Sequence, residues 1–277
     1  MLDRERSPRR IWGLLPSGHP TPAVLFVLIG AGCSTGSGIP DYRDADGRWK
    51  RLAPATYQDF MGQVSARRRY WARSLLGWRR FRGARPNDAH RALARLEAMG
   101  KSELLLTQNV DRLHQAAGSA KVIDLHGRLD CVRCMGCGGA ASRDDVQNEL
   151  SRLNPGWLGL DAASAPDGDA DLDGADFSSF EVPACRRCAG VLKPDVVFFG
   201  ESVPRDRVAA AMRHLDEADA MLVVGSSLMV YSGYRFVETA ARAGKPVAAV
   251  TLGRTRADAL LSLKVESPCE VALAFLL

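Results

Sequence analysis

Residues 30–44 read GAGCSTGSGIPDYRD and directly follow the uninterrupted apolar run 23–29. An apolar run of this length is typical of a strand buried on both faces, as in a parallel sheet. Four glycines fall within the first nine residues of the stretch, and glycine lets the backbone turn sharply and approach a ligand closely. A strand that runs into such a loop is where α/β proteins bind a nucleotide diphosphate. The stretch therefore favours an α/β fold and is a candidate nucleotide site.

The glycine spacing alone leaves a structural turn equally open. The first two glycines fit the dinucleotide fingerprint, but Thr35 stands where a third Gly or Ala is expected. The residues that follow favour a ligand, because Asp41, Tyr42 and Arg43 come directly after the loop. A guanidinium suits a pyrophosphate or ribose, and an aromatic side chain can cover a flat ring.

Length and charge exclude some classes of protein. A chain of 277 residues suggests about two domains. Its net charge of +5 is mild and comes mostly from dispersed arginines, so a solvated basic surface is the simpler interpretation and we expect no nucleic-acid partner. No apolar run reaches the roughly 18 residues that span a bilayer, so we expect no membrane association.

The N-terminal residues bear on the state of the seven cysteines. Residues 1–10 carry charges of both signs and no apolar h-region follows, so we expect no signal peptide and a cytoplasmic protein of the bacterial type. The arginines leave a mitochondrial transit peptide open, although Asp3 and Glu5 argue against it. Residues 1–20 are interpreted as an N-terminal arm. Reduced cysteines would be available to bind metal.

Residues 51–83 are rich in Arg, Leu and aromatic residues and interrupt the alternation of strands and helices. A helix is expected over 64–76, and within it Tyr70 and Arg73 share a face because they are three residues apart. A segment inserted beyond a nucleotide loop often covers the ligand, and a surface helical excursion is the alternative.

The rest of the chain alternates between predicted strands and helices, which indicates a doubly wound parallel sheet. The helix over 87–100 has Ala89, Leu93, Leu96 and Met99 on its apolar side. Further strands are expected at 104–106, 122–125, 196–199, 221–224 and 247–251, with further helices at 208–218 and 234–244.

Polar residues follow several of these strands. The segment 107–114 reads TQNVDRLH, whose amides and carboxylate could bind a carboxamide or ribose hydroxyls. Helix capping by Asn109 or Asp111 remains an equally good explanation. The loop 225–227, Gly-Ser-Ser, suits phosphate oxygens. His126 ends the short strand before the cysteines and is a natural general base, although a lone histidine is more often just hydrogen-bonded.

The cysteine spacing is the strongest single signal. Cys134 and Cys137 form one C-x-x-C knuckle, and Cys185 and Cys188 form a second. Four thiolates are the closed tetrahedral set of a structural zinc. Cys131 also has this spacing to Cys134, but a glycine directly after the second ligand favours the later pair. A redox C-x-x-C is the rival interpretation, which the matched second pair makes less attractive.

Together these motifs resemble those of the sirtuins, the NAD-dependent protein deacylases. The resemblance is carried in order by GAGCSTGSGIPDYRD, TQNVDRLH, the LHG at 125–127, the paired knuckles, KPDVVFFGE at 193–201 and GSSLMVYSGYRF at 225–236. RYWARSLLGW, APDGD and TRADAL are most similar to the class II branch. In the family the first knuckle begins eight residues after the catalytic histidine, which again favours Cys134 over Cys131.

The resemblance implies a Rossmann-like doubly wound parallel sheet with a smaller zinc-binding domain and a helical insertion. The expected parts are an N-terminal arm at 1–20, an NAD-binding domain at 21–50, 84–127 and 190–277, a helical lid at 51–83 and a zinc-binding module at 128–189. It also implies NAD and Zn²⁺ as cofactors and acyl-lysine proteins as substrates.

The resemblance further assigns roles to residues. His126 is expected to be the general base on the nicotinamide ribose, with Asn109 orienting that ribose. Expected NAD contacts are Gly30, Ala31, Gly32, Ser34, Thr35, Ile39, Asp41, Tyr42, Arg43, Gln108, Asn109, Val110, Asp111, Gly225, Ser226, Ser227, Thr251, Leu252 and Gly253, with Cys269 included although a buried thiol is its ordinary interpretation. The expected peptide strand is Val196, Val197, Phe198, Phe199 and Gly200, while Tyr70 and Arg73 resemble a pair that reads acidic acyl groups.

Two departures and two alternatives accompany this hypothesis. Cys33 replaces the usual Ile of the glycine loop, and Thr251 stands where the family commonly has Asn, which removes a carboxamide for ribose hydroxyls. The alternative functions are protein mono-ADP-ribosyl transfer and a non-catalytic module that binds NAD and zinc. The sequence does not predict the oligomeric state.

Overall fold

The computed structural model describes residues 23–50, 54–160, 169–170, 172 and 174–277, so the predicted arm at 1–20 lies outside the described residues. By their internal contacts these residues form two units. The first unit contains the described residues up to 50 together with Arg85–Leu125 and Val203–Leu277. The second contains the described residues of 54–84 and of 126–202. It thus joins the predicted lid to the predicted zinc module and also includes His126 and residues 190–202.

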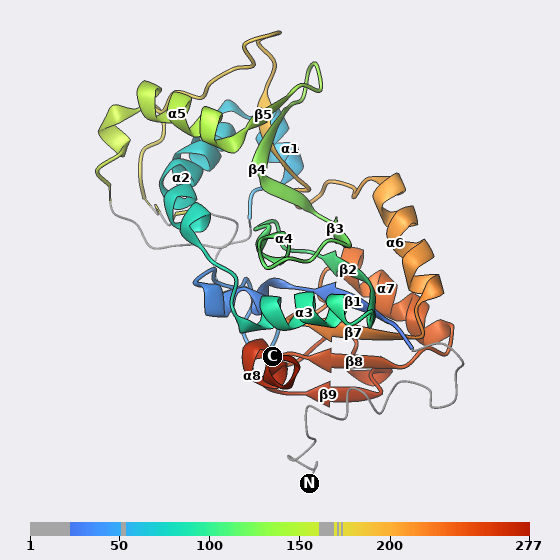
Figure 1. Cartoon of the computed structure of the whole chain (residues 1–277). Helices are drawn as coiled ribbons and strands as arrows, with labels where there is room; N and C mark the ends of the chain where they lie inside the picture. The colour runs from blue at the N-terminus through green and yellow to red at the C-terminus, as the bar shows by residue number, and fades with distance from the viewer. Residues whose placement is uncertain (1–22, 51–53, 161–168, 171, 173) are drawn as a thin grey trace. The chain divides into compact units, whose positions relative to one another are not determined.

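A parallel six-stranded sheet forms the centre of the first unit (Figure 1). Its order is β3-β2-β1-β7-β8-β9, and every pairing is parallel. This is the Rossmann order, in which the chain direction across the sheet reverses between β1 and β7, so the ligand crevice is expected at the carboxyl ends of these two strands. The strands are β1 (Leu25–Ile29), β2 (Ser102–Thr107), β3 (Val122–Asp124), β7 (Ala220–Val224), β8 (Val247–Val250) and β9 (Leu263–Val265).

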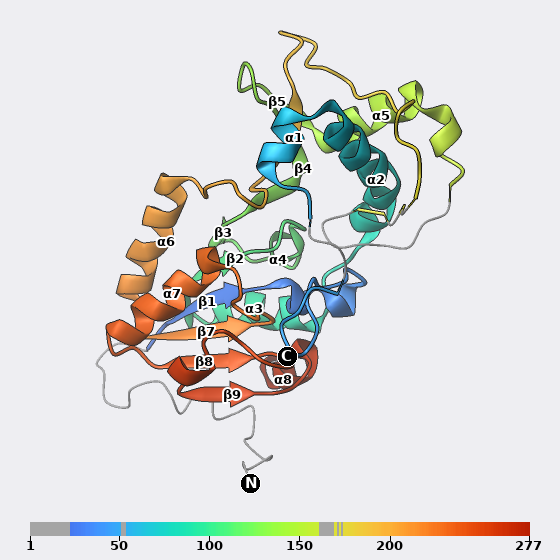
Figure 2. The ribbon, with the colours of Figure 1, turned by 180° about the vertical axis from the view of Figure 1, so that it is seen from behind.

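Helices cover both faces of this sheet (Figures 1 and 2). Alternate residues of β1 point to opposite faces, so Val27 belongs to one buried cluster and Phe26 to the other. The first cluster includes apolar residues of α3 (Asp88–Ala98) and α8 (Cys269–Ala272), and the second includes those of α6 (Arg205–Glu217) and α7 (Tyr231–Arg242). The whole of β1 is buried, as its uninterrupted apolar sequence predicts.

Short helical segments complete the first unit. They are α4 (Leu113–Ala116) and the 3-10 turns η2 (Ala31–Cys33), η3 (Thr35–Ser37), η6 (Asp258–Leu260) and η7 (Ala274–Leu276). One expectation about α3 was wrong, because the side chain of Met99 is 53% exposed. The helix ends at Ala98, so Met99 lies at its C-cap and off the buried face.

The second unit combines a small antiparallel sheet with helices. β4 (Gly127–Cys134) lies between β5 (Ala140–Ser142) and β6 (Leu192–Val196). Its helices are α1 (Tyr57–Gly62), α2 (Val64–Gly83) and α5 (Arg143–Leu153), with the 3-10 turn η4 (Pro155–Trp157). The prediction of a strand at 196–199 in the parallel sheet was wrong. The strand ends at Val196 and pairs with β4, because the preceding residues from Leu192 already form the ladder.

A buried arginine links α2 to α5. The guanidinium of Arg143 lies over the rings of Trp71 and Trp78 and donates to the carbonyl and hydroxyl oxygens of Ser74. Gln147, one turn later on α5, donates to the carbonyl of Leu75 at 2.8 Å. These contacts fix α5 against the middle of α2. In the part of the chain that the structure describes, every helix is too short or too polar to cross a membrane.

Candidate active site and metal centre

The loops after β1 and β7 touch through their backbones. Gly32 N–H donates to the carbonyl of Gly225 at 2.8 Å. A Cβ on Gly30 would lie 2.6 Å from the Cβ of Ser226, and a Cβ on Gly225 would lie 2.3 Å from the backbone nitrogen of Cys33. Gly225 also has a φ of +64°, a conformation that disfavours other residues. The glycines therefore let the two loops pack backbone against backbone at the point where the sheet order reverses.

A hydrogen-bond network joins the loop after β1 to the loop after β2. Ser34, which is 1% exposed, donates its hydroxyl to Asp111 Oδ2 at 2.6 Å. The amide of Asn109 donates to Ser34 Oγ at 3.0 Å and to the carbonyl of Gly30 at 3.2 Å. Burial raises the pKa of Asp111, although its bonds to Ser34 and to the Leu113 N–H oppose the shift. Asp111 therefore joins the first N–H of α4 to this network.

The predicted phosphate loop is bonded to the same strand end. Ser226 Oγ donates to Gln108 Oε1 at 2.8 Å and accepts from the N–H of Leu228 at 3.2 Å. A Cβ on Gly233 would lie 2.5 Å from the Gln108 side-chain nitrogen, so the glycine at the start of α7 leaves room for this amide. Ser227, the next residue of this loop, is half-buried.

The loop after β8 carries three further predicted contacts. Thr251 is buried and its N–H donates to the carbonyl of Val265, whereas Leu252 is 62% exposed. A Cβ on Gly253 would lie 2.4 Å from the carbonyl oxygen of Ala45, so this loop touches the end of the glycine-rich stretch. In the same unit, the predicted contact Cys269 is 3% exposed, with its sulfur 3.8 Å from the carbonyl of Gly32.

The segment after the glycine loop is held by its own residues. Asp41 forms an ion pair with Lys50. The guanidinium of Arg43 donates to the carbonyl of Gly47 at 2.7 Å and lies 3.9 Å from the ring centroid of Trp49. The ring of Tyr42 meets the same indole edge-on. The remaining predicted contacts nearby are Ala31, which is half-buried, Thr35, which is exposed, and Ile39 and Val110, which are both buried.

His126 lies in the second unit, directly before β4. It is half-buried, and its carbonyl accepts a hydrogen bond from the N–H of Val197 at 2.8 Å. Gly127 has a φ of +85°, and a Cβ there would lie 2.1 Å from the carbonyl oxygen of Asp195. This close approach needs glycine, and it fixes the backbone of His126 against the end of β6.

The predicted peptide strand already has several backbone partners. The N–H of Phe198 donates to Glu201 Oε2, which also forms an ion pair of 2.9 Å with the buried Lys193. The carbonyl of Phe199 accepts from the N–H of Tyr57, and the carbonyl of Gly200 accepts from the side chain of Gln58. The segment therefore turns away from a regular strand after Val196.

Tyr70 and Arg73 both contact other residues of the second unit. Tyr70 is 8% exposed and its ring packs against Phe60 and Phe198, with centroids 5.3 and 5.2 Å away. Burial raises its pKa far above the usual range. Arg73 Nε donates to the carbonyl of Ala170 at 3.0 Å and lies 3.7 Å from Asp169 Oδ2. Arg73 thus already has a carboxylate partner.

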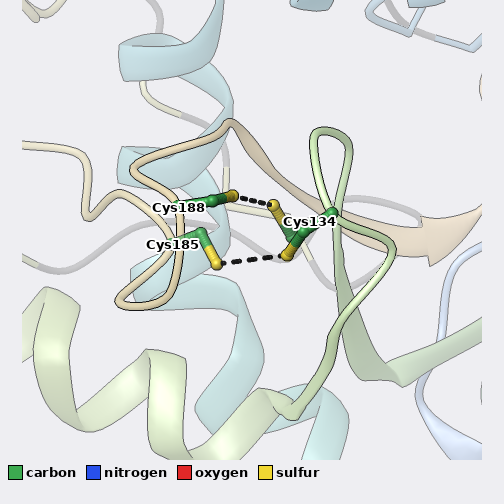
Figure 3. Close-up of side chains that lie close together, drawn as sticks. Cys134, Cys185 and Cys188 are labelled. Atoms are coloured by element: carbon green, nitrogen blue, oxygen red, sulfur yellow. Dashed lines mark hydrogen bonds between the residues drawn. The ribbon is translucent and has the colours of Figure 1, made fainter.

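The four predicted zinc ligands lie together (Figure 3). All four sulfur atoms are within 4.8 Å of one another, with 3.5 Å between Cys134 and Cys188 and 3.8 Å between Cys137 and Cys185. A tetrahedral ion with Zn–S bonds of about 2.3 Å needs sulfurs about 3.8 Å apart, so the cluster fits zinc. Cys131 lies outside the group, as the glycine argument predicts.

The second sphere of this cluster favours thiolates. The backbone N–H of Gly139 and the guanidinium of Arg187 lower the pKa of Cys137 to about 6. Arg187 Nε lies 3.2 Å from the Cys137 sulfur. A Cβ on Gly190 would lie 3.0 Å from the sulfur of Cys134, so this glycine leaves room for the sulfur cluster. Four protein ligands leave no coordination position for a reactant, which makes the expected role structural.

Sequence reasoning missed Asn87. Its side-chain amide donates to the carbonyl of Cys33 at 2.8 Å and so supports the glycine loop. The same residue forms a capping box with His90 at the start of α3. The available signal was an Asn directly before the first helical residue, which predicts an N-cap but not a contact more than fifty residues away.

Comparison with known proteins agrees with this architecture. The Sir2 family model matches residues 30–232, and the chain belongs to the Sir2 family. It is 70% identical to NAD-dependent protein deacetylase 2 of Bradyrhizobium diazoefficiens, over 91% of this chain and 93% of that one. It is also 70% identical to the NAD-dependent protein deacetylase of Xanthomonas campestris pv. campestris, over 91% of this chain and 86% of the relative.

Solved structures give the same family. One described as "Sir2-p53 peptide-NAD+" is 31% identical with a TM-score of 0.70 and covers 91% of both chains. A second, "Structure of Sir2Tm bound to a propionylated peptide", has the same identity, TM-score and coverage.

Proposed function

We propose that this chain is an NAD-dependent protein-lysine deacylase, which transfers the acyl group from lysine to ADP-ribose and releases nicotinamide. The observation that carries the proposal is the network of Ser34, Asn109 and Asp111 beside the packed glycine loops at Gly30 and Gly225. Relatives that are 70% identical over nine-tenths of the chain are NAD-dependent protein deacetylases.

The first unit fits the cofactor through its chemistry. The glycine-rich loops after β1 and β7 meet at the carboxyl ends of these strands, which is where a Rossmann sheet holds a pyrophosphate. The two donor bonds of Asn109 fix the plane of its amide, so Oδ1 can accept from a ribose hydroxyl. Bound NAD would supply the ADP-ribosyl group and the nicotinamide leaving group.

The second unit supplies the proposed base. An imidazole titrates near neutral pH, so His126 can accept a proton from a ribose hydroxyl. Its backbone is fixed by Val197 and by the close approach of Gly127 to Asp195. Such anchoring limits the positions that the ring can reach, and orientation is a large part of rate enhancement.

Acyl-lysine peptides are the proposed substrates. Solved relatives hold acetylated and propionylated peptides. The segment 196–200 remains the proposed peptide strand, to which a substrate would bind by β-strand addition. Assignment to the class II branch and a cytoplasmic location are parts of the same proposal.

The test is a reaction with an acetyl-lysine peptide and NAD. Deacetylated peptide, nicotinamide and O-acetyl-ADP-ribose should appear in equal amounts. His126→Ala should remove this activity while zinc content and thermal stability stay unchanged. His214→Ala is the matched control, because His214 lies on α6 and is paired with Glu103, and neither residue has a proposed role.

Two outcomes would contradict the proposal. Full turnover by His126→Ala would remove the proposed base from the mechanism. NAD labelled in its adenosine part distinguishes the alternative reaction, since label that stays on protein after denaturation indicates mono-ADP-ribosyl transfer. NAD binding without nicotinamide release would indicate a non-catalytic module.

A further inference from the structure

A cysteine and two histidines meet beneath the glycine loop of the first unit. Cys33, His90 and His114 each offer one ligand atom, and these atoms lie within 4.8 Å of one another. The exposed fractions of the three residues are 0%, 0% and 1%, and the two imidazole rings are 4.6 Å apart. The residues come from η2, α3 and α4, so three separate elements converge on one point.

His114 is the unusual member of this cluster. Neither of its ring nitrogens has a hydrogen-bond partner among the residues that the structure describes. Buried polar groups in proteins are nearly always bonded, so a fully buried imidazole without a partner needs an explanation. A metal ion is a partner that takes the lone pair of such a nitrogen.

His90 is oriented as a metal ligand usually is. Its Nδ1 lies 2.8 Å from Asn87 Oδ1 and 3.3 Å from the Asn87 backbone nitrogen, so Asn87 holds the ring in place. The tautomer with its proton on Nδ1 leaves the lone pair on Nε2 for a metal. Metal-binding histidines commonly donate their second ring N–H to a fixed acceptor in this way. Asn87 also holds the carbonyl of Cys33 at 2.8 Å, so one side chain positions two of the three ligands.

The protonation states agree with this arrangement. Burial lowers the pKa of His90 to about 4 and that of His114 well below its usual range, so both rings are neutral at pH 7. Neutral imidazole is the form that binds a metal. Burial raises the pKa of Cys33, so without a metal it remains a thiol.

We propose that Cys33, His90 and His114 form a second metal site, which takes a divalent ion of the Zn²⁺ type. One thiolate and two imidazoles are a donor set that zinc accepts, and three protein ligands leave its fourth position open. The hydroxyl of Ser34 lies 3.5 Å from His90 Nε2. When the ion binds, a sulfur–metal bond forms, the S–H bond of Cys33 breaks and the proton leaves to solvent.

Cobalt(II) is the probe for this site, because a cobalt–thiolate bond absorbs in the near ultraviolet. Protein with one zinc per chain is titrated with Co²⁺, and both metals are counted after desalting. We expect one bound cobalt with the absorption of a single thiolate and a tetrahedral visible band, while the zinc content stays at one. Added Zn²⁺ should displace this cobalt.

Variants assign the ligands. Cys33→Ile, which restores an apolar side chain, and His114→Gln should each lose the cobalt while keeping one zinc and a cooperative thermal transition. Cys131→Ser and Cys269→Ser are matched controls that should keep it, since neither thiol belongs to the cluster. The proposal is overturned if wild type binds no cobalt at tenfold excess, or if the thiolate absorption survives in folded Cys33→Ile. Both readouts are independent of deacylase activity.

Discussion

The N–H of Val197 donates to the carbonyl oxygen of His126 at 2.8 Å. One backbone hydrogen bond therefore joins the proposed general base to the proposed peptide strand. The bond is possible because Gly127 turns the chain with a positive φ and lets β4 come close to the end of β6. Peptide binding and the position of the base should accordingly respond together to changes in this turn.

Gly127→Ala should impair both peptide binding and the position of His126. The new Cβ would lie 2.1 Å from the carbonyl oxygen of Asp195 and would also sit at a φ of +85°. We expect a loss of about 1–3 kcal/mol in the free energy of unfolding, with a fall in kcat/KM for peptide beyond any loss of folded protein. Gly118→Ala is the matched control, because Gly118 has a positive φ but nothing within 4 Å of its Cβ. Equal behaviour of the two variants in urea unfolding and kinetics would contradict the close-approach argument.

Asn109→Ala should weaken NAD binding. The substitution removes the amide that bonds Ser34 and the carbonyl of Gly30, and with it the acceptor proposed for the ribose. Loss of a hydrogen bond costs about 1 kcal/mol or more, so we expect the Kd for NAD to rise at least about fivefold in calorimetry. Asn148→Ala on the exposed side of α5 is the control and should leave the Kd unchanged. An unaltered Kd in Asn109→Ala would remove this residue from the cofactor site.

Cys188→Ser should remove the structural zinc. Three thiolates hold zinc less tightly than four. Without zinc, the three remaining cysteines are no longer joined to one another. Metal analysis should fall from one zinc per chain toward none, with a lower Tm and greater sensitivity of the second unit to protease. Cys131→Ser should keep both the zinc and the Tm, because its sulfur lies outside the cluster. Loss of zinc from Cys131→Ser instead would mean that the ligand set is wrong.

The protein should become less stable as the pH is lowered, because its buried histidines resist protonation. The pKa of His90 is about 4 in the folded protein against an ordinary value of 6.5, so between these values the unfolded chain binds a proton that the folded chain does not. The free energy of unfolding therefore decreases as pH falls from 6.5 to 4, by about 3 kcal/mol for this residue. Urea unfolding at several pH values gives the free energy of unfolding as a function of pH. The slope of this dependence should be flatter for metal-free His90→Gln than for metal-free wild type.

Buried carboxyl groups with raised pKa values, Asp169 and Asp111, have the opposite effect on stability. Burial raises the pKa of Asp169 to about 7, so its contribution to stability decreases as pH rises. Because both carboxyl groups are present in both proteins, the difference between the wild-type and His90→Gln slopes isolates the histidine. Parallel slopes would show that His90 titrates normally in the folded protein.

Acyl preference should depend on the pairing of Arg73 with Asp169. A carboxylate already lies 3.7 Å from Arg73 Nε, so an acidic acyl group would have to compete with it. We expect wild type to favour acetyl over succinyl peptides, and Asp169→Asn to raise succinyl turnover relative to acetyl. Arg73→Met should abolish that gain. A ratio that stays constant across the three proteins would exclude the pair Tyr70 and Arg73 from acyl recognition.

Much of the first unit could be predicted from local patterns. The apolar run before Gly30 predicts a fully buried strand, and β1 is buried throughout. Strand and helix alternation predicts the parallel sheet because crossover helices are needed to connect parallel strands. The short β9 escaped notice because three residues, Leu263–Val265, carry too little periodicity to distinguish a strand.

The second unit was harder to predict because its contacts are not local. The run after Lys193 is apolar enough for a buried strand, yet the antiparallel partner β4 is more than fifty residues earlier and sets where β6 ends. The zinc ligands could be predicted because each C-x-x-C pair lies within four consecutive residues and is visible in the sequence. The cluster around Cys33 could not, since no motif records that His90 and His114 approach it in the fold.

The two units also differ in when they can be completed on the ribosome. All residues of the second unit have been made once Ser202 emerges, whereas the central strand β1 of the first unit waits for its neighbour β7 at Ala220–Val224. The apolar strand Leu25–Ile29 is thus synthesised early and gains its last partner late, and its exposed edge invites wrong pairing during that interval. Nascent chains should accordingly be most prone to aggregate before residue 224 is released, when the cysteine cluster can already hold its ion.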